Sequence, residues 1–221
     1  MAKTILTPFQ QKFLTILAND PYITKHFYFT GGTVLSEFYL HHRLSEDFDL
    51  FSEEKEVYLP AVTAFLTKIK AKLGIAEMEH RPFLGLHSFI LRLKNGNVFK
   101  IDFNYYPFPR IEKGLKYKNL EVDSLYDIAV NKIHTLFMNP RTRDYVDLYF
   151  IFKESDFALE NLIMDAKAKF DWHIDSLLLG AKLRKATRIT DLPRMLIPFN
   201  KKDMEAFFLK LAKSLEGDIF K

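Results

Sequence analysis

Polar and apolar residues alternate at every second position in several stretches of the first half of the chain. This period is typical of strands with one buried face. Aromatic and β-branched runs extend the pattern, and Asn95-Gly96-Asn97 is a strong signal for a hairpin between the last two stretches. The predicted strands are residues 27–30, 47–51, 76–80, 85–94 and 98–104.

Elsewhere apolar residues recur every three or four positions, which predicts amphipathic helices. Thr7 followed by Pro8 is typical of a helix start, and Gly74 of a helix end. The predicted helices are residues 8–18, 34–42, 59–73, 124–137, 141–152, 158–170, 175–184 and 203–215.

Because all predicted strands precede the later helices, the pattern indicates an α+β protein with two domains. We expect a small mixed sheet with flanking helices in residues 1–110 and a helical domain in residues 111–221. We expect the second domain to form one wall of a cleft that contains the site.

Composition excludes several classes of protein. With 48% hydrophobic and 15% aromatic residues, the 221-residue chain is not disordered. The absence of Cys excludes a disulfide framework and a thiolate metal site, and favours the cytoplasm. No run of 18 apolar residues and no signal-peptide core are found, so we expect no membrane span. A formal charge of +4 permits an acidic or nucleic-acid partner without requiring one.

Three carboxylates on predicted strands are candidates for metal chemistry. Asp47 and Asp49 project from one face of a strand, about 6–7 Å apart. Asp102 lies on the polar face of another strand, with the same alternation. Mg²⁺ is usually held by one or two carboxylates plus substrate phosphates, and converging strand carboxylates are typical of two-metal phosphoryl transfer. The alternative is a solvated edge strand with surface acids.

The turn Gly31-Gly32-Thr33 joins a predicted strand to a predicted helix. Bare backbone N–H groups and the positive end of a helix dipole suit a phosphate group. Ser45 can hydrogen-bond the same phosphate. The alternatives are an ordinary turn and an ordinary loop serine.

The order of these motifs resembles the AbiEii/AbiGii nucleotidyltransferase toxin family, within the polymerase-β-like nucleotidyltransferase superfamily. The turn GGT is followed by a helix and then by R-x-S-x-D-x-D-L-F at residues 43–51. Residues 127–133, DIAVNKI, resemble the lysine-bearing helix of that family, and residues 143–149, RDYVDLY, resemble its R-D-x-x-D-L-Y segment. The combined motifs span residues 29–150.

The resemblance implies roles for the residues around the nucleotide. Gly31 and Gly32 would hold the triphosphate, Thr33 and Ser45 would assist, and Lys132 would meet the phosphates. Taken without the family pattern, Lys132 is an ordinary lysine on the polar face of a helix. The chain also departs from the superfamily, because its turn reads Gly-Gly-Thr in place of Gly-Ser.

For the acids, the resemblance implies that Asp47, Asp49 and Asp102 ligate Mg²⁺ or Mn²⁺. Asp102, the third carboxylate, is suited to activating the attacking hydroxyl, although little local motif surrounds it. Asp144 would lie near the base or act as the late acid of the family motif. Structural roles at the start of a helix are the alternative for Arg143 and Asp144.

The activity that the resemblance implies is transfer of an NMP from an NTP to an acceptor hydroxyl, with loss of pyrophosphate. The acceptor would be an RNA end, with the 3′ end of tRNA as the first candidate. The setting would be a toxin–antitoxin or phage-defence system, with a cognate antitoxin as a protein partner. One alternative is a nucleotidyltransferase that modifies a small molecule or a protein. Another is a non-catalytic protein that binds NTP or RNA.

A basic cluster follows in the helical half. Lys182, Arg184, Lys185 and Arg188 lie within seven residues. A solvated helix face is the ordinary interpretation, and an RNA backbone is the alternative.

Overall fold

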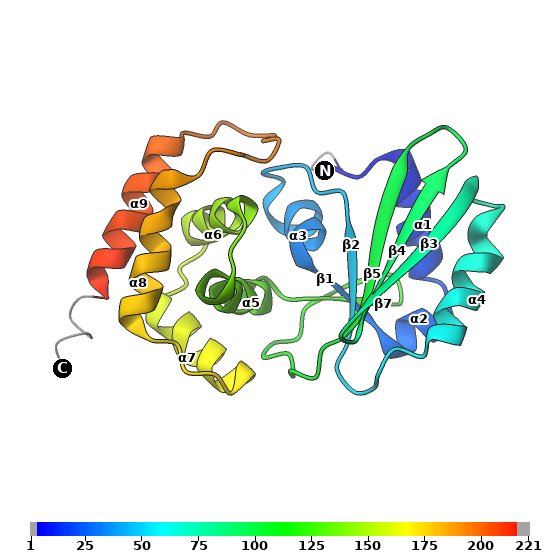
Figure 1. Ribbon diagram of the computed structural model, residues 1–221, viewed down its shortest axis with the longest axis horizontal. Coiled ribbons are helices and arrows are strands. Elements are labelled where there is room, and N and C mark those ends of the chain that lie inside the picture. Colours follow the sequence, from blue (N-terminus) through cyan, green and yellow to red (C-terminus); the bar gives the residue numbers. More distant parts are fainter. Residues whose placement is uncertain (1–3, 216–221) are drawn as a thin grey trace. The chain divides into compact units, whose positions relative to one another are not determined.

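The computed structural model describes residues 4–215, and Figure 1 shows the order of the helices and strands along the chain. The described chain forms two compact units, each built from two stretches. Unit 1 contains residues 4–38 and Ser45–Ser124, and unit 2 contains Tyr39–Leu44 and residues 125–215. The units therefore divide later than the predicted boundary after residue 110, and a short early segment belongs to unit 2.

Unit 1 is built on a seven-stranded mixed sheet with the order β3-β4-β5-β2-β1-β7-β6. The strands are β1 (Tyr28–Thr30), β2 (Phe48–Ser52), β3 (Ile75–Phe83), β4 (Leu86–Leu93), β5 (Val98–Tyr105), β6 (Leu115–Tyr117) and β7 (Leu120–Val122). Strand β1 runs antiparallel to β2 and parallel to β7, and β2 runs parallel to β5. The mixed sheet confirms the α+β class that the alternation predicted.

Four helices accompany this sheet: α1 (Pro8–Leu17), α2 (Pro21–His26), α3 (Gly31–Val34) and α4 (Leu59–Lys70). Figure 1 shows α1, α2 and α4 on one side of the sheet and α3 on the other. On the α1 side, the rings of Phe13, Phe48 and Phe99 pack against one another with centroids 5.0 to 6.1 Å apart. The apolar face of the sheet is therefore buried against helices, and its polar face is the one toward α3.

Unit 2 is helical, as predicted. Its elements are α5 (Leu125–Met138), α6 (Thr142–Glu154), α7 (Leu159–Phe170), α8 (Ser176–Arg184), the 3₁₀ turn η2 (Lys185–Arg188) and α9 (Lys201–Ser214). The segment Tyr39–Leu44 belongs here because Leu44 N donates to Arg194 O and Leu196 N donates to His42 O. Backbone pairing over such a sequence separation cannot be read from local periodicity.

The predicted helices and strands are confirmed with shifted ends, apart from the helix at residues 34–42. That helix begins earlier, as α3, and continues as the π-helix η1 (Leu35–Leu40). Four elements were missed: helix α2, which Asp20 caps, the strands β6 and β7, which are only three residues each, and the 3₁₀ turn η2. Strands β6 and β7 extend the sheet past residue 110, which explains why the predicted boundary fell too early.

No helix within residues 4–215 is both long enough and apolar enough to cross a membrane.

Candidate functional site

The acidic strands and the glycine turn meet on one face of the sheet in unit 1. Thr30 lies opposite Asp49 across β1 and β2, and Asp49 lies beside Asp102 across β2 and β5. Side chains of residues that are paired in this way share a face of the sheet. Asp47, two residues before Asp49 and directly before β2, completes the set, so the structure brings the predicted acids to one face.

A lysine lies between two of these carboxylates. Lys100 Nζ is 2.5 Å from Asp102 Oδ2 and 3.9 Å from Asp47 Oδ2. The side chain of Asp102 is 8% exposed, and that of Asp47 is 32% exposed. Asp102 Oδ1 is buried and accepts no hydrogen bond from the described residues. The ammonium group thus pairs with one oxygen of Asp102, and the other oxygen has no hydrogen bond from the described residues.

The acids do not form a ready-made metal cage: within residues 4–215, no group of three or more His, Asp or Glu side chains is arranged to hold a metal ion. Mg²⁺ needs no such cage, because it is usually held by one or two carboxylates, water and substrate phosphates. The buried, unbonded oxygen of Asp102 and the close approach of Asp47 and Asp102 to one cation fit a divalent ion in this manner.

Gly31 places the turn directly against the acids. Its φ of +82° is in the left-handed region, and a Cβ atom at this position would collide with the carboxylate of Asp49. Only glycine therefore allows the start of α3 to approach the carboxylate this closely. The turn and the acidic strand are in contact, as the motif order suggested.

Thr33 and Ser45 connect the turn to the acidic strand. Thr33 is buried, and its Oγ1 lies 2.9 Å from Ser45 Oγ and within hydrogen-bond distance of the carbonyl oxygen of Asp47. Both hydroxyl groups are thus engaged with the protein. Their contribution in this arrangement is to fix Gly31 and Gly32 relative to Asp47.

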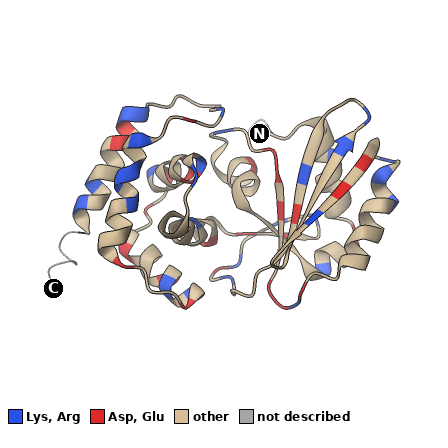
Figure 2. Ribbon diagram, in the orientation of Figure 1, with Lys and Arg blue, Asp and Glu red and all other residues tan. Residues whose placement is uncertain are grey.

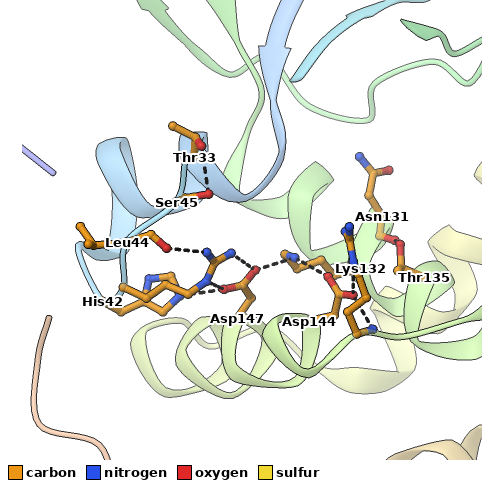
Figure 3. Close-up of polar contacts among 11 residues, drawn as sticks. Thr33, His42, Leu44, Ser45, Asn131, Lys132, Thr135, Asp144 and Asp147 are labelled. Atoms are coloured by element: carbon orange, nitrogen blue, oxygen red, sulfur yellow. Dashed lines mark hydrogen bonds and ion pairs between the residues drawn. The ribbon is translucent and has the colours of Figure 1, made fainter. Parts of the chain in front are cut away.

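Lys132 and Asp144 lie in unit 2, within a buried network of charged side chains (Figure 3). Its centre is Asp147, which is fully buried. Asp147 Oδ1 lies 2.6 Å from Arg43 Nε and 2.8 Å from His42 Nε2. Asp147 Oδ2 lies 2.6 Å from Lys132 Nζ and 2.8 Å from an Arg43 terminal nitrogen. The network joins the segment Tyr39–Leu44 to helices α5 and α6.

Asp144 extends this network. It accepts from Lys132 Nζ at 3.0 Å and from the backbone N–H of Arg141 at 2.9 Å, so it also caps the start of α6. Burial raises the pKa of Asp144, but the Lys132 ammonium and these hydrogen bonds outweigh burial and hold the pKa below its ordinary value. Asp144 is therefore ionised and paired at neutral pH.

The same balance is stronger at Asp147. Burial alone raises its pKa, but the charges of Lys132 and Arg43 and the hydrogen bonds from Arg43 and His42 hold the pKa well below its ordinary value. His42 responds in the opposite way, because burial lowers the pKa of its imidazole. The network therefore contains two carboxylates, two cations and an imidazole whose neutral form burial favours.

Four functional candidates were not predicted as site residues from the sequence: Lys100, His42, Arg43 and Asp147. A signal existed for Lys100, since it lies two residues before Asp102 on the same strand face. The pairing of Arg43 with Asp147 spans 104 residues and had no local signal, although both residues lie within the recognised motifs.

Comparison with protein families gives a match over residues 12–217 to the model described as nucleotidyl transferase AbiEii toxin, type IV toxin–antitoxin system. No curated protein matches the sequence.

Three solved structures share the fold at 16% sequence identity. A putative nucleotidyltransferase from Helicobacter pylori has a TM-score of 0.62, over 95% of this chain and 92% of that one. JHP933, also from H. pylori, has a TM-score of 0.58 over 95% and 90% of the two chains. MenT4, a nucleotidyltransferase toxin of Mycobacterium tuberculosis, has a TM-score of 0.52 over 86% and 75%.

Proposed function

The chain belongs to the AbiEii family of nucleotidyl transferase toxins of type IV toxin–antitoxin systems, and we propose that it moves an NMP from an NTP to an acceptor hydroxyl in a metal-dependent reaction. The observation that supports this proposal most is the shared face of Asp49 and Asp102 beside the close-packed Gly31 turn. A solvated edge strand with surface acids would not need a buried carboxylate oxygen without a hydrogen bond, as Asp102 Oδ1 is.

In this proposal Asp47, Asp49 and Asp102 hold Mg²⁺ or Mn²⁺. When bound, the ion supplies charge neutralisation for the triphosphate and favours ionisation of the attacking hydroxyl. Asp102, the third carboxylate, favours deprotonation of the acceptor hydroxyl, whose oxygen bonds to the α-phosphorus of the NTP as pyrophosphate leaves.

The backbone N–H groups of Gly31 and Gly32 bind phosphate oxygens, since a turn without side chains lets the phosphates approach the backbone closely. Thr33 and Ser45 keep this turn against the acidic strand through the hydrogen bonds described above. The phosphates and the acids are thereby held next to each other.

For Lys132 and Asp144 we propose a positioning role in unit 2, because each is already paired inside the Asp147 network. A buried ammonium with two carboxylate partners is poorly suited to leave them for a phosphate. Their effect on the nucleotide would come from the fixed relation of α5 to α6.

The acceptor we propose is an RNA end, with the 3′ end of tRNA first, and the protein partner is a cognate antitoxin. We propose the cytoplasm as the setting, which agrees with a chain that contains no Cys. A small-molecule or protein acceptor, and a non-catalytic NTP or RNA binder, are the rival functions.

Incubation of the protein with each α-labelled NTP, Mg²⁺ or Mn²⁺, and total tRNA tests the proposal. We expect label on RNA with one or more NTPs, no transfer in EDTA, and a loss of at least about a hundredfold in Asp49→Asn and Asp102→Asn. Asp156→Asn, which changes an exposed acid of unit 2, is the matched control and should transfer normally.

Each rival has its own outcome. Label on a small molecule or on protein in place of RNA would change the acceptor but keep the reaction. NTP binding without transfer to any acceptor would leave a binding protein and remove the enzymatic proposal.

A further inference from the structure

Positive charge is concentrated in one stretch of unit 2. Residues 176–202 contain seven Lys and Arg residues and a single acid, Asp191. Four of these cations lie on α8 and the turn η2: Lys182, Arg184, Lys185 and Arg188. Figure 2 shows the Lys and Arg residues of α8 along its ribbon.

Unlike the cations of the buried network, these cations are not neutralised by the protein. Arg184, Lys185 and Arg188 are exposed, and none of the three forms an ion pair with any described residue. Lys182 Nζ donates to the carbonyl oxygen of Met138 at 2.6 Å. The net positive charge of this surface therefore faces solvent, where it can attract an anion.

The backbone holds the cations in a defined arrangement. In a 3₁₀ turn, side chains three residues apart project in nearly the same direction, so Lys185 and Arg188 lie on one side. Ala186 is buried beneath them, and Tyr145 Oη donates to Lys182 O at 2.8 Å. The end of α8 and the turn are thereby anchored to α6.

Two hollows flank this pair of cations, and Lys185 and Arg188 line both. The first, of about 410 Å³, is also lined by Asn139, Thr142, Tyr145, Lys182 and Thr190 among others. The second, of about 450 Å³, is also lined by Arg184 and Thr187, together with the apolar residues Ala181 and Leu209. Hydroxyl and amide donors beside Lys and Arg are the groups that proteins use for phosphate and sugar contacts.

We propose that this surface, the α8–η2 surface, binds the sugar-phosphate backbone of the acceptor RNA. The proposal rests on nucleotidyl transfer to RNA as the function. Two adjoining hollows with cations between them match a repeating chain of phosphates better than a single anion, because successive charges can occupy successive hollows. No base-specific contact is required, so binding depends on charge and on the backbone.

The test measures binding without catalysis. A fluorescein-labelled RNA hairpin with a single-stranded 3′ end is titrated with protein by anisotropy at several salt concentrations, without NTP and in EDTA. The variant R184Q/K185Q/R188Q removes three exposed cations and keeps Lys182. We expect about tenfold weaker binding and a salt dependence that is less steep by about 2 in the log–log slope, since each single-strand phosphate contact contributes about 0.7.

The matched control is K68Q/K70Q/K72Q, which removes two lysines in the last turn of α4 and one lysine just after it, all in unit 1. It should bind RNA as the unchanged protein does. Equal loss in both variants would overturn the proposal, because bulk charge would then explain binding. Unchanged binding by R184Q/K185Q/R188Q would also overturn it.

Two further measurements identify which kind of molecule binds the α8–η2 surface. A DNA hairpin of the same sequence should bind more weakly, and equal binding would overturn the assignment to RNA. Poly-glutamate should not displace the RNA at equal charge concentration, and displacement would point to an acidic protein. The variant keeps the acids of unit 1, so it should still transfer label to RNA when the RNA concentration is high. This outcome would show that the variant has lost binding of RNA and not catalysis.

Discussion

Two clusters of carboxylates and cations in this protein differ in how completely their charges are paired. In unit 2, both oxygens of the buried Asp147 are engaged, by Arg43, Lys132 and His42. In unit 1, Asp102 has one described ion-pair partner, Lys100, and one of its oxygens accepts no described hydrogen bond. The same residue types therefore make a network in unit 2 in which every carboxylate oxygen is paired, here called the saturated network, and a face in unit 1 in which one carboxylate oxygen is not.

This contrast indicates which of the two clusters can accept a ligand. A buried charge that is fully paired gains nothing from a further ion and costs several kcal/mol to disturb. Asp102 is nearly buried and one of its oxygens has no described hydrogen bond, so it can still gain stabilisation from a bound cation. Pairing and burial, more than the presence of Asp and Lys, separate a structural network from a candidate catalytic site.

The largest expected effect comes from breaking the saturated network. Asp147→Ala leaves Arg43 and Lys132 buried without their main counter-charge, and we expect a loss of about 3–5 kcal/mol in the free energy of unfolding. Urea denaturation followed by circular dichroism measures it. Asp49→Asn in unit 1 is the comparison, and a similar loss in that variant would contradict the contrast between the clusters.

A smaller effect is expected at the turn beside the acids. Gly31→Ala combines a left-handed backbone with a collision against Asp49, and we expect a loss of about 1–3 kcal/mol in stability together with loss of transfer. Gly96→Ala is the matched control, because Gly96 has a φ of +86° but nothing within 4 Å of a Cβ atom. If both variants lose equal stability, the contact with Asp49 has no cost of its own.

The pH dependence of stability reports on His42. Its folded pKa is below the unfolded value of about 6.5, chiefly because of burial, with Arg43 and Lys132 lowering it further and Asp147 raising it. The unfolded chain therefore binds the proton more readily, so stability falls as the pH falls below about 6.5, until the folded pKa is reached.

We expect this fall to reach at most about 1.4 kcal/mol per pH unit. Urea unfolding at pH values from about 5 to about 7, a range that includes the ordinary histidine pKa, measures it. His42→Gln should reduce the slope of the profile, and part of the slope should remain because burial also lowers the pKa of His87 and of His134. His173→Gln, at an exposed position, is the control. A profile unchanged by His42→Gln would remove His42 as its source.

The smallest expected effect is at Lys100. Its side chain is 35% exposed, so its ion pair with Asp102 is screened, and Lys100→Met should cost less than about 1 kcal/mol. Lys132→Met, in the saturated network, should cost about 3 kcal/mol or more. Thermal and urea unfolding of the two variants measure the loss in the free energy of unfolding. Equal losses would contradict the contrast between the two clusters.

Much of the fold was predictable because local periodicity reports which face of an element is buried. The alternation around Phe48 and Leu50 predicted a strand with Asp47 and Asp49 on its polar side, and the structure has that strand. The π-helix η1 and the short strands β6 and β7 were not predictable. Each has only three to six residues, which is too few for a pattern of apolar positions to identify the element.

Local patterns in the sequence predicted most of the elements, the class and the polar face on which each candidate acid lies, since these follow from neighbours a few residues apart. The position of β2 between β1 and β5, which puts Asp49 beside Asp102, is visible only in the folded chain. The same is true of the pairing of Arg43 with Asp147. A charge or a backbone group that is buried without a partner costs free energy. The partner that satisfies it comes from a distant part of the sequence and lies nearby only in the fold.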